Sequence, residues 1–284
     1  MATTSQSNVA VPIGIVSRNR AVYLDCTLRS LSATHLPSNV PVVVFDDASD
    51  DPATRAYLDS NEPVVTDHQW PREEAWRAAG LDFLPNSPKL HGIVNRVAVR
   101  RLASESCGVC NASCAAIEEL FDRFPRAPGV IVLQDDVVFN FDWYQRLTSH
   151  ARKAQAAPAR IGLVAGMHFD RVFATQMYVM PAQVLLYYTA QCYYLTRPFY
   201  QRLRSWFRRK DHARADFDRQ LCHLAQYNGF AVEVIRPFVC QHIGVDSSVR
   251  SDRSYFGDKN TLMRIGLSSR PPYVFADSVR DFLR

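Results

Sequence analysis

The sequence lacks the features that would place the chain in a membrane or in the secretory route. It has no uninterrupted apolar run of the roughly 20 residues that a membrane helix needs. Its first residues do not show the basic-then-apolar order of a signal peptide, and there is no long Gly/Ser or Gln/Asn tract. We therefore expect a packed cytoplasmic protein without a transmembrane segment, and peripheral association with a membrane stays an open alternative.

Lysine is also scarce, although the net charge is +5: only four of the 33 basic side chains are lysines and the other 29 are arginines. An arginine fork binds phosphate through two hydrogen bonds, so the composition favours an acidic ligand. Charge alone does not choose among a nucleotide, a nucleic acid and a lipid head group. A general preference for arginine over lysine explains the composition equally well.

Cysteine is present in an odd number, seven, which argues against a disulfide framework. Cys107, Cys110 and Cys114 have a spacing that invites a zinc or iron–sulfur interpretation. No fourth ligand lies nearby in the sequence and no second Cys-x-x-Cys exists, so we predict cysteines packed on and before a buried helix.

Apolar runs alternate with helical patterns along most of the chain, which predicts an α/β fold with a mainly parallel sheet flanked by helices. Strands are expected at residues 9–16, 40–45, 62–67, 130–133, 161–165, 177–195 and 231–235, and helices at residues 23–31, 51–61, 111–123, 143–154, 198–210 and 216–228. No linker or repeat divides the chain, so a single domain is expected, with residues 1–8 as a flexible N-terminus.

Two of the expected buried strands end in a pair of aspartates, Asp46-Asp47 and Asp135-Asp136. Because the carboxyl ends of parallel strands meet at one edge of a sheet, the two pairs should lie close together. Neighbouring carboxylates repel each other unless a cation or hydrogen-bond donors compensate them. Mn²⁺ or Mg²⁺ is the expected cation, since both prefer carboxylate and diphosphate oxygens.

These motifs resemble those of a known enzyme family. Residues 11–20 read Val-Pro-Ile-Gly-Ile-Val-Ser-Arg-Asn-Arg, and residues 42–51 read Val-Val-Val-Phe-Asp-Asp-Ala-Ser-Asp-Asp. Together with Gln134-Asp135-Asp136 they resemble GT-A-fold, Rossmann-like glycosyltransferases, particularly family 2 and its bacterial relatives. The resemblance implies one catalytic domain over residues 9–284, with a nucleotide-sugar-binding half at 9–136 and an acceptor-binding half with a C-terminal loop at 137–284.

The resemblance also implies roles for particular residues. Donor contacts would come from Ser17, Arg18, Asp46 or Asp47, Asp135 and Asn111, while Asp136 would bind the metal, with His242 as a candidate second ligand. An ordinary hydrogen-bonded histidine is an equally good interpretation of His242. Gln134 departs from the family pattern, which more often has an acidic residue there, and this leaves one carboxylate fewer for the metal.

The catalytic residues are expected near the helix at residues 216–228, because Asp216 and Asp218 resemble a block of inverting members of the family. Asp216 would act there as the general base for the acceptor hydroxyl, or it would only cap the helix. The resulting hypothesis is metal-dependent, inverting transfer of a sugar from a nucleoside diphosphate, UDP being the expected one, to a glycan, a glycolipid or a modified nucleic acid.

Three other functions remain open at this point. A nucleotidyltransferase has a similar sheet but usually a Gly-rich basic loop, which is absent here. A nucleic-acid-binding or DNA-modifying protein would use the basic, aromatic segment 198–214. That segment also fits an amphipathic helix with buried aromatics and solvated arginines. A non-catalytic sugar-nucleotide binder is the third alternative.

Overall fold

A computed structural model describes the chain at residues 10–32, 34–60, 97–102, 104–156, 161–166, 178–180, 190–209, 212, 217–235 and 239–242. The strands in this part are β1 (Ile13–Ser17), β2 (Val42–Asp46), β3 (Val97–Arg101), β4 (Gly129–Gln134), β5 (Val137–Phe139), β6 (Ile161–Ala165), β7 (Tyr178–Met180), β8 (Cys192–Thr196), β9 (Ala231–Val234) and β10 (Cys240–His242). The helices are α1 (Ala21–Ser32), α2 (Pro52–Ser60), α4 (Val109–Arg123), α5 (Trp143–Ala156), α6 (Arg197–Arg202), α7 (Arg204–Phe207) and α8 (Phe217–Tyr227).

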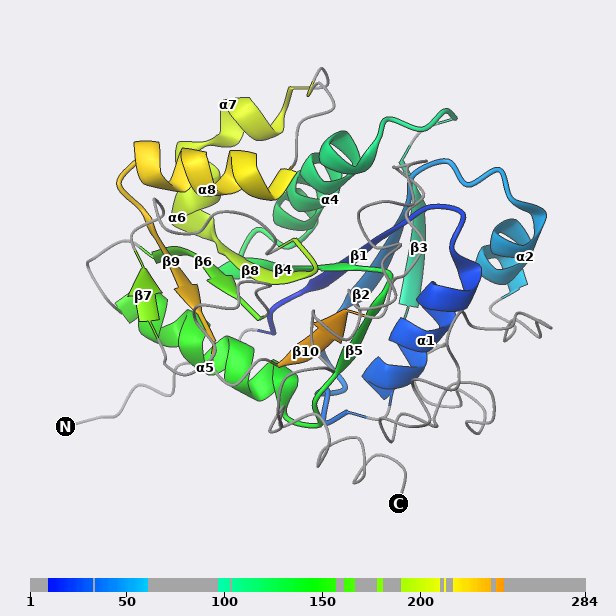
Figure 1. The fold of residues 1–284 in the computed structure, drawn as a ribbon, viewed down its shortest axis with the longest axis horizontal. Coiled ribbons are helices and arrows are strands. Elements are labelled where there is room, and N and C mark those ends of the chain that lie inside the picture. Colours follow the sequence, from blue (N-terminus) through cyan, green and yellow to red (C-terminus); the bar gives the residue numbers. More distant parts are fainter. Residues whose placement is uncertain are drawn as a thin grey trace, which may run out of the picture.

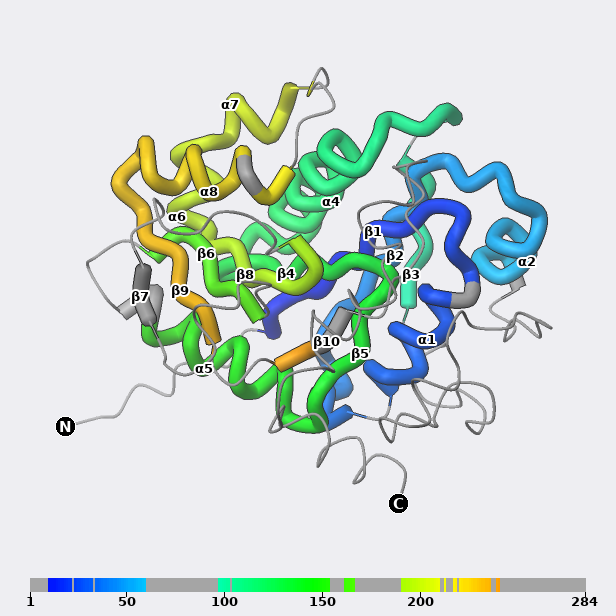
Figure 2. Tube along the Cα trace, viewed as in Figure 1, coloured from blue at the N-terminus to red at the C-terminus, as the bar shows by residue number. Residues whose placement is uncertain are grey.

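Eight of the described strands form one mixed sheet in the order β3-β2-β1-β4-β8-β6-β9-β7, and β5 pairs with β10 in a separate two-stranded sheet. Strands β3, β2, β1 and β4 are parallel, whereas β8 runs antiparallel to both β4 and β6. The trace in Figure 2 shows the N-terminal strand β1 in the interior of the sheet, between β2 and β4. The predicted α/β class with a mainly parallel sheet is confirmed.

Helices cover both faces of the sheet (Figure 1): α4, α6, α7 and α8 lie on one face, and α1 and α5 on the other. Strand β4 shows why helices are needed on both faces of the sheet. Val130 and Val132 pack in the core under α4, while Ile131 and Leu133 pack in the core that contains α1 and α5. A strand buried on both faces needs apolar side chains at every position, which is the continuous run seen in the sequence.

Most predicted elements are present within a residue or two of their expected bounds, although the strand expected at 9–16 begins only at Ile13. The strand expected at 177–195 is wrong as a single element, because its described part contains β7 and most of β8, which lie apart in the sheet. The helix expected at 198–210 is also wrong as a single element. It is two short helices, α6 and α7, that meet at Leu203, whose backbone N–H bonds the carbonyls of both Phe199 and Tyr200. Strands β3, β5 and β10 were not expected. The strand expected at 62–67 lies outside the described residues. Among the described helices, none is long and apolar enough to cross a bilayer.

Candidate functional site

The two aspartate pairs lie at one edge of the sheet, on either side of β1. In the parallel register Ser17 is opposite Asp46 on β2, and Val16 is opposite Gln134 on β4. Each pair therefore stands where its strand ends, with Ser17 between them. The predicted convergence of the two pairs on one rim is confirmed at the level of strand register.

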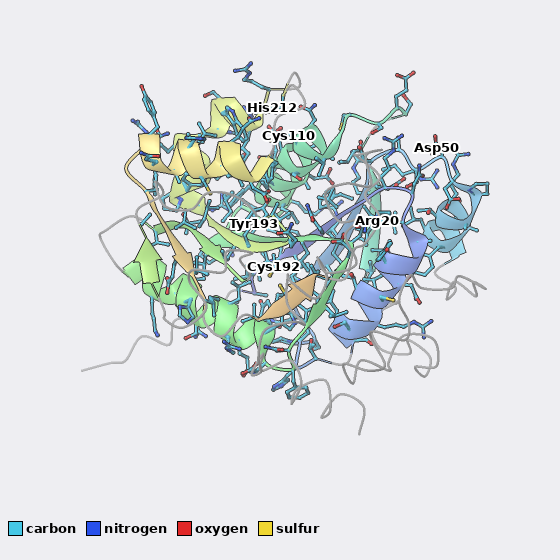
Figure 3. All side chains as sticks on the ribbon, viewed as in Figure 1. Arg20, Asp50, Cys110, Cys192, Tyr193 and His212 are labelled. Carbon is cyan, nitrogen blue, oxygen red and sulfur yellow. The ribbon has the colours of Figure 1, made fainter. Side chains whose placement is uncertain are left out.

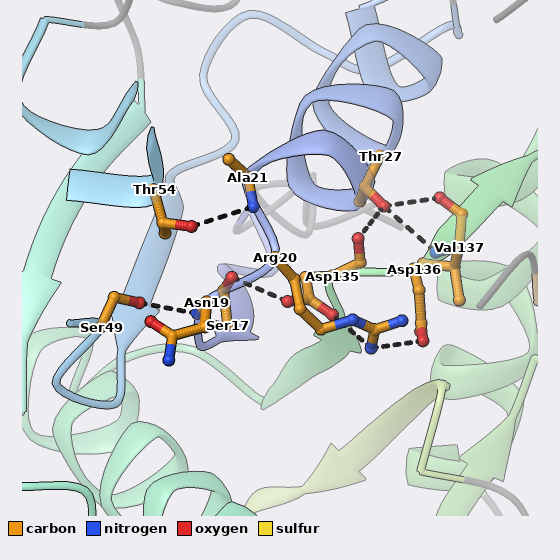
Figure 4. Close-up of polar contacts among 10 residues, drawn as sticks. All are labelled: Ser17, Asn19, Arg20, Ala21, Thr27, Ser49, Thr54, Asp135, Asp136 and Val137. Atoms are coloured by element: carbon orange, nitrogen blue, oxygen red, sulfur yellow. Dashed lines mark hydrogen bonds and ion pairs between the residues drawn. The ribbon is translucent and has the colours of Figure 1, made fainter. Parts of the chain in front are cut away.

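The second pair is held by Arg20, from the loop that connects β1 to α1 (Figure 4). The Nη1 atom of Arg20 lies 3.0 Å from Oδ1 of Asp135 and 2.6 Å from Oδ2 of Asp136. The Ser17 hydroxyl donates to the other oxygen of Asp135, Oδ2, at 2.7 Å. The ring of Tyr23 lies under the guanidinium, 4.3 Å from its central carbon. One arginine thus bridges two carboxylates that are almost fully buried.

Burial and mutual charge set the electrostatics of this group. Removal from water raises the pKa of Asp135 to about 6, against the charge of Arg20, which lowers it, while the charge of Asp136 raises it further. The two carboxylates raise the pKa of Arg20 above its ordinary value in spite of burial, which acts in the opposite direction. Arg20 therefore keeps its positive charge and serves the two aspartates as a counter-charge.

Helix α1 fixes the turn that carries the second pair. The Thr27 hydroxyl lies 2.8 Å from the carbonyl oxygen of Asp135 and 2.9 Å from that of Val137, and it accepts the backbone N–H of Val137 at 3.1 Å. Figure 4 shows these contacts on the side of the turn away from Arg20. The link between β4 and β5 is thereby attached to the helix that follows Arg20.

The first pair is held by neutral groups instead. The carboxylate of Asp46 accepts the backbone N–H of Ser49 at 3.2 Å. Both oxygens of Asp47 accept hydrogen bonds from the segment that leads into α4: the Ser106 hydroxyl at 2.8 Å, the N–H of Cys107 at 2.8 Å and the N–H of Gly108 at 3.1 Å. Arg18 joins the same cluster by donating to the Ser106 hydroxyl at 2.6 Å.

Both loops at this rim contain a residue in the left-handed region, Asn19 at φ 52° and Ala48 at φ 52°. The side chain of Asn19 accepts the backbone N–H groups of Asp50 at 2.9 Å and Asp51 at 3.0 Å, so it ties one loop to the other. Left-handed conformations are unfavourable for non-glycine residues and concentrate at functional sites. The two loops are thus held in place by the contacts between them.

Two further predicted site residues lie on helices, Asn111 on α4 and Asp218 on α8. Asn111 donates to the carbonyl oxygens of Cys107 at 2.8 Å and His212 at 3.4 Å, and its own oxygen accepts the N–H of His212 at 3.2 Å. Asp218 is in the first turn of α8.

Burial raises the pKa of the Tyr193 hydroxyl, and nearby charges, including that of Asp218, raise it further. Figure 3 shows Tyr193, Cys110 and His212 on this side of the molecule. Asp216 lies outside the described residues.

Within the described residues, no group of three or more His, Cys, Asp or Glu side chains is arranged to hold a metal ion. Cys110 and Cys114 are buried on α4, as expected for cysteines packed on a helix, and all seven cysteines are free thiols. The carboxylates of Asp135 and Asp136 are the right donor type for Mg²⁺ or Mn²⁺. The backbone of His242 is opposite Val137, the residue after Asp136, and its side chain is outside the described part.

Sequence reasoning assigned no role to Arg20, Thr27 or Gln191. Gln191 precedes β8, and its backbone carbonyl accepts the N–H of Gln134 at 3.0 Å, directly before the second pair. Its side-chain oxygen is buried and has no hydrogen-bond partner among the described residues, as is true of Arg18 Nε and Arg20 Nη2. Arg20 was visible in the sequence as the last residue of the Ser-Arg-Asn-Arg loop; the other two had no local signal.

In the described part of the basic segment 198–214, and at Arg197 just before it, arginine side chains make contacts within the protein. Arg208 pairs with Glu118 at 2.7 Å and Arg204 with Asp122 at 4.0 Å, both on α4. Arg197 donates to the backbone carbonyls of Ala127 and Phe124. The aromatic side chains Phe199, Tyr200 and Phe207 are buried in the core. This agrees with an amphipathic segment that packs its aromatics inward.

No protein-family model matches the sequence, and no curated protein sequence matches it. Solved structures do share its fold. Staphylococcus aureus TarS is 13% identical with a TM-score of 0.54, and the match covers 96% of this chain and 43% of TarS. TarS 1–349 in complex with UDP-GlcNAc is 13% identical with a TM-score of 0.54, over 96% of this chain and 71% of that one.

The mannosyltransferase PcManGT from Pyrobaculum calidifontis, in complex with GDP-Man and Mn²⁺, is also 13% identical, with a TM-score of 0.52 over 95% of this chain and 68% of its own. This chain covers less than half of the longer TarS chain. The expected GT-A-like fold is confirmed by these neighbours.

Proposed function

We propose that this chain is a metal-dependent, inverting glycosyltransferase that moves a sugar from a nucleoside diphosphate sugar, with UDP as the nucleotide, to an acceptor hydroxyl. The observation that carries the proposal is the rim at which β1, β2 and β4 end, where two aspartate pairs and Ser17 come together. In open α/β sheets the crevice outside the carboxyl ends of the strands is where ligands bind. The neighbours with UDP-GlcNAc and with GDP-Man and Mn²⁺ bound support the same assignment.

The chemistry of the rim fits a phosphate-bearing ligand. Arg18 Nε and Arg20 Nη2 are buried N–H donors without a partner among the described residues. Buried donors of this kind are costly unless a ligand or water completes them, and guanidinium groups suit diphosphate oxygens. Asp136, with His242 as a candidate second ligand, would hold Mn²⁺ or Mg²⁺. That ion, when bound, would neutralise charge on the departing diphosphate.

The acceptor half of the proposal rests on α8. Asp218 lies in its first turn, where a carboxylate is stabilised as the anion by the helix dipole. Asp216, which directly precedes the helix in the sequence, is proposed as the general base that takes the proton from the acceptor hydroxyl, and Asp218 is the second proposed catalytic residue. Attack on the anomeric carbon from the face opposite the diphosphate inverts the configuration, and no covalent sugar–protein intermediate is required.

Donor binding is tested by screening nucleotide sugars for stabilisation against heat, with and without Mn²⁺. The wild type is compared with Asp136→Asn and with Asp122→Asn, a matched control on the exposed face of α4. We expect one UDP-sugar to raise the melting temperature in a Mn²⁺-dependent manner in the wild type and the control but not in Asp136→Asn. Equal responses in all three proteins would refute the assignment of Asp136.

Catalysis is tested separately from binding, because a non-catalytic sugar-nucleotide binder would pass the first experiment. Asp216→Asn should bind the identified donor with unchanged affinity yet lose its slow hydrolysis or its transfer to acceptors. An NMR spectrum of the product gives the anomeric configuration and so distinguishes inversion from retention. Salt-sensitive binding of DNA or RNA without any response to nucleotide sugars would instead support the nucleic-acid alternative.

A further inference from the structure

Arg20 occupies the position at which a cation is expected. Its side chain is 14% exposed, and those of Asp135 and Asp136 are 4% exposed, so all three charges are removed from bulk water. Buried charges persist only where a partner of opposite sign compensates them. The single guanidinium bridges both carboxylates through one nitrogen, Nη1, which makes it a built-in monovalent substitute for a bound ion.

Arg20 contacts the two carboxylates at different distances. Asp135 receives a second hydrogen bond from the Ser17 hydroxyl at 2.7 Å, on the oxygen that Arg20 does not contact. It therefore keeps a neutral partner if the guanidinium shifts. The contact of Arg20 with Asp136 is the shorter of its two, at 2.6 Å to Oδ2. Asp136 is also the residue that the proposed function assigns to the metal.

From this arrangement we infer that Arg20 and a divalent ion exclude each other at Asp136, so that Arg20 holds the acidic pair in the absence of donor and must leave Asp136 when metal binds. The inference rests on the proposed function only in assigning the ion to Asp136. Mg²⁺ and Mn²⁺ bind carboxylate oxygens at about 2.1 Å. An ion at Oδ2 and Nη1 at its observed position would be like charges within a few ångströms in a buried site.

The ligand itself can offer new partners to a displaced Arg20. Its Nη2 atom is buried without a hydrogen-bond partner among the described residues, and its guanidinium is already held over the Tyr23 ring. A diphosphate arriving with the ion would offer oxygen acceptors to this free N–H group. Metal alone should therefore bind weakly, because Arg20 must be moved without compensation, whereas metal and nucleotide together should bind well.

The experiment measures Mn²⁺ affinity without any nucleotide, from the loss of the EPR signal of aqueous Mn²⁺. If the metal-ready state, with Arg20 off Asp136, is a minor state, the observed affinity is reduced by its population, so removing Arg20 should tighten binding by about tenfold or more. We expect this gain in Arg20→Gln and its loss in the double variant Arg20→Gln/Asp136→Asn. The control is Arg29→Gln, which removes an arginine that pairs with Asp25 on the same helix and should leave Mn²⁺ affinity unchanged.

Equal or weaker Mn²⁺ binding by folded Arg20→Gln would overturn the inference, as would absence of Mn²⁺ binding in both proteins. If Arg20→Gln does not fold, it is combined with Asp135→Asn, which removes one of the two carboxylates left without a counter-charge, and the reference is Asp135→Asn alone. We again expect tighter Mn²⁺ binding in the variant without Arg20. Binding equal to or weaker than that of the reference would again reject competition. Because no sugar is transferred in this measurement, the outcome is independent of turnover. A donor response through Asp136 with no effect of Arg20→Gln would leave the proposed function standing and the inference refuted.

Discussion

The two aspartate pairs at the rim have the same sequence pattern and different chemistry. Asp46-Asp47 and Asp135-Asp136 each follow a buried strand that lies directly beside β1. The first pair is compensated by backbone N–H groups and a hydroxyl, all from loops that it holds in place. The second pair is bridged by the charge of one long side chain, Arg20, and Asp135 also accepts the Ser17 hydroxyl.

The nature of the partner determines what each pair can do. Backbone amides are fixed by the fold, so Asp47 anchors the segment before α4 and exchanging its partners would require rearranging the loop. A side chain can rotate away, so the partner of Asp136 is replaceable by another cation. We therefore regard the first pair as an organiser of the site and the second as the part that exchanges ligands.

The largest expected effect comes from removing the charge that holds the second pair. Arg20→Ala leaves two buried carboxylates without their guanidinium and should lower the free energy of unfolding by about 3–5 kcal/mol at neutral pH. Urea denaturation measures the change. Arg101→Ala, which breaks the exposed pair with Asp59, is the control and should cost less than about 1 kcal/mol. A loss of that small size for Arg20→Ala would mean that Arg20 is not the principal counter-charge.

Measuring stability against pH tests the same pair through the protonation of Asp135. Burial raises the pKa of Asp135 from 3.8 to about 6, so between these values the folded protein binds more protons than the unfolded chain. The contribution of Asp135 to stability must then fall as the pH rises through this window. We expect the unfolding free energy of the wild type, relative to that of Asp135→Asn, to decrease by about 1–3 kcal/mol between pH 4 and 6.5. A difference that is constant or grows with pH would contradict this.

The first pair should respond to mutation but not to metal. Asp47→Ala deprives the N–H groups of Cys107 and Gly108 of their acceptor and should cost about 2–3 kcal/mol. Amide hydrogen exchange at these two residues should accelerate, which localises the loss to the segment before α4. The loss of unfolding free energy in Asp47→Ala should be the same with and without Mn²⁺. A loss that depends on Mn²⁺ would mean that the first pair also responds to metal, as the second is expected to do.

The sequence predicted the strands that carry the pairs because β2 and β4 are buried on both faces and are therefore apolar at nearly every position. It did not predict β3, whose Val-Ala-Val-Arg-Arg segment is mostly exposed at the sheet edge. The break at Leu203 was also missed, since neither proline nor glycine marks it and the aromatic residues on both sides are buried.

The groups that compensate the two aspartate pairs could not be predicted from the sequence, for a different reason. Arg20 meets Asp135 across 115 positions of the chain, and Cys107 meets Asp47 across 60. A local pattern identifies a carboxylate at a strand end, yet which donor reaches it depends on how helices and loops pack. The two identical Asp-Asp motifs could therefore be located from the sequence, while their different chemistry required the fold.

The smallest expected effect concerns the backbone of the loop that follows the first aspartate pair. Ala48, directly after the first pair, has φ 52°, a conformation that glycine adopts without the steric cost of a Cβ atom. Ala48→Gly should therefore raise the free energy of unfolding by about 0.5 kcal/mol, after the larger entropy of glycine in the unfolded chain is included. Ala56→Gly, the same substitution within α2, should instead lower it by about 1 kcal/mol.

Thermal or urea unfolding of these two variants gives the sign directly. A gain for Ala48→Gly would mean that the loop after the first pair is kept in a strained shape by the contacts of Asp46 and Asn19, as expected of a fixed organiser. A loss as large as that of Ala56→Gly would mean that the alanine conformation carries no strain. The rigidity of the first pair would then have to come from Asp47 and its bonds to the segment before α4 alone.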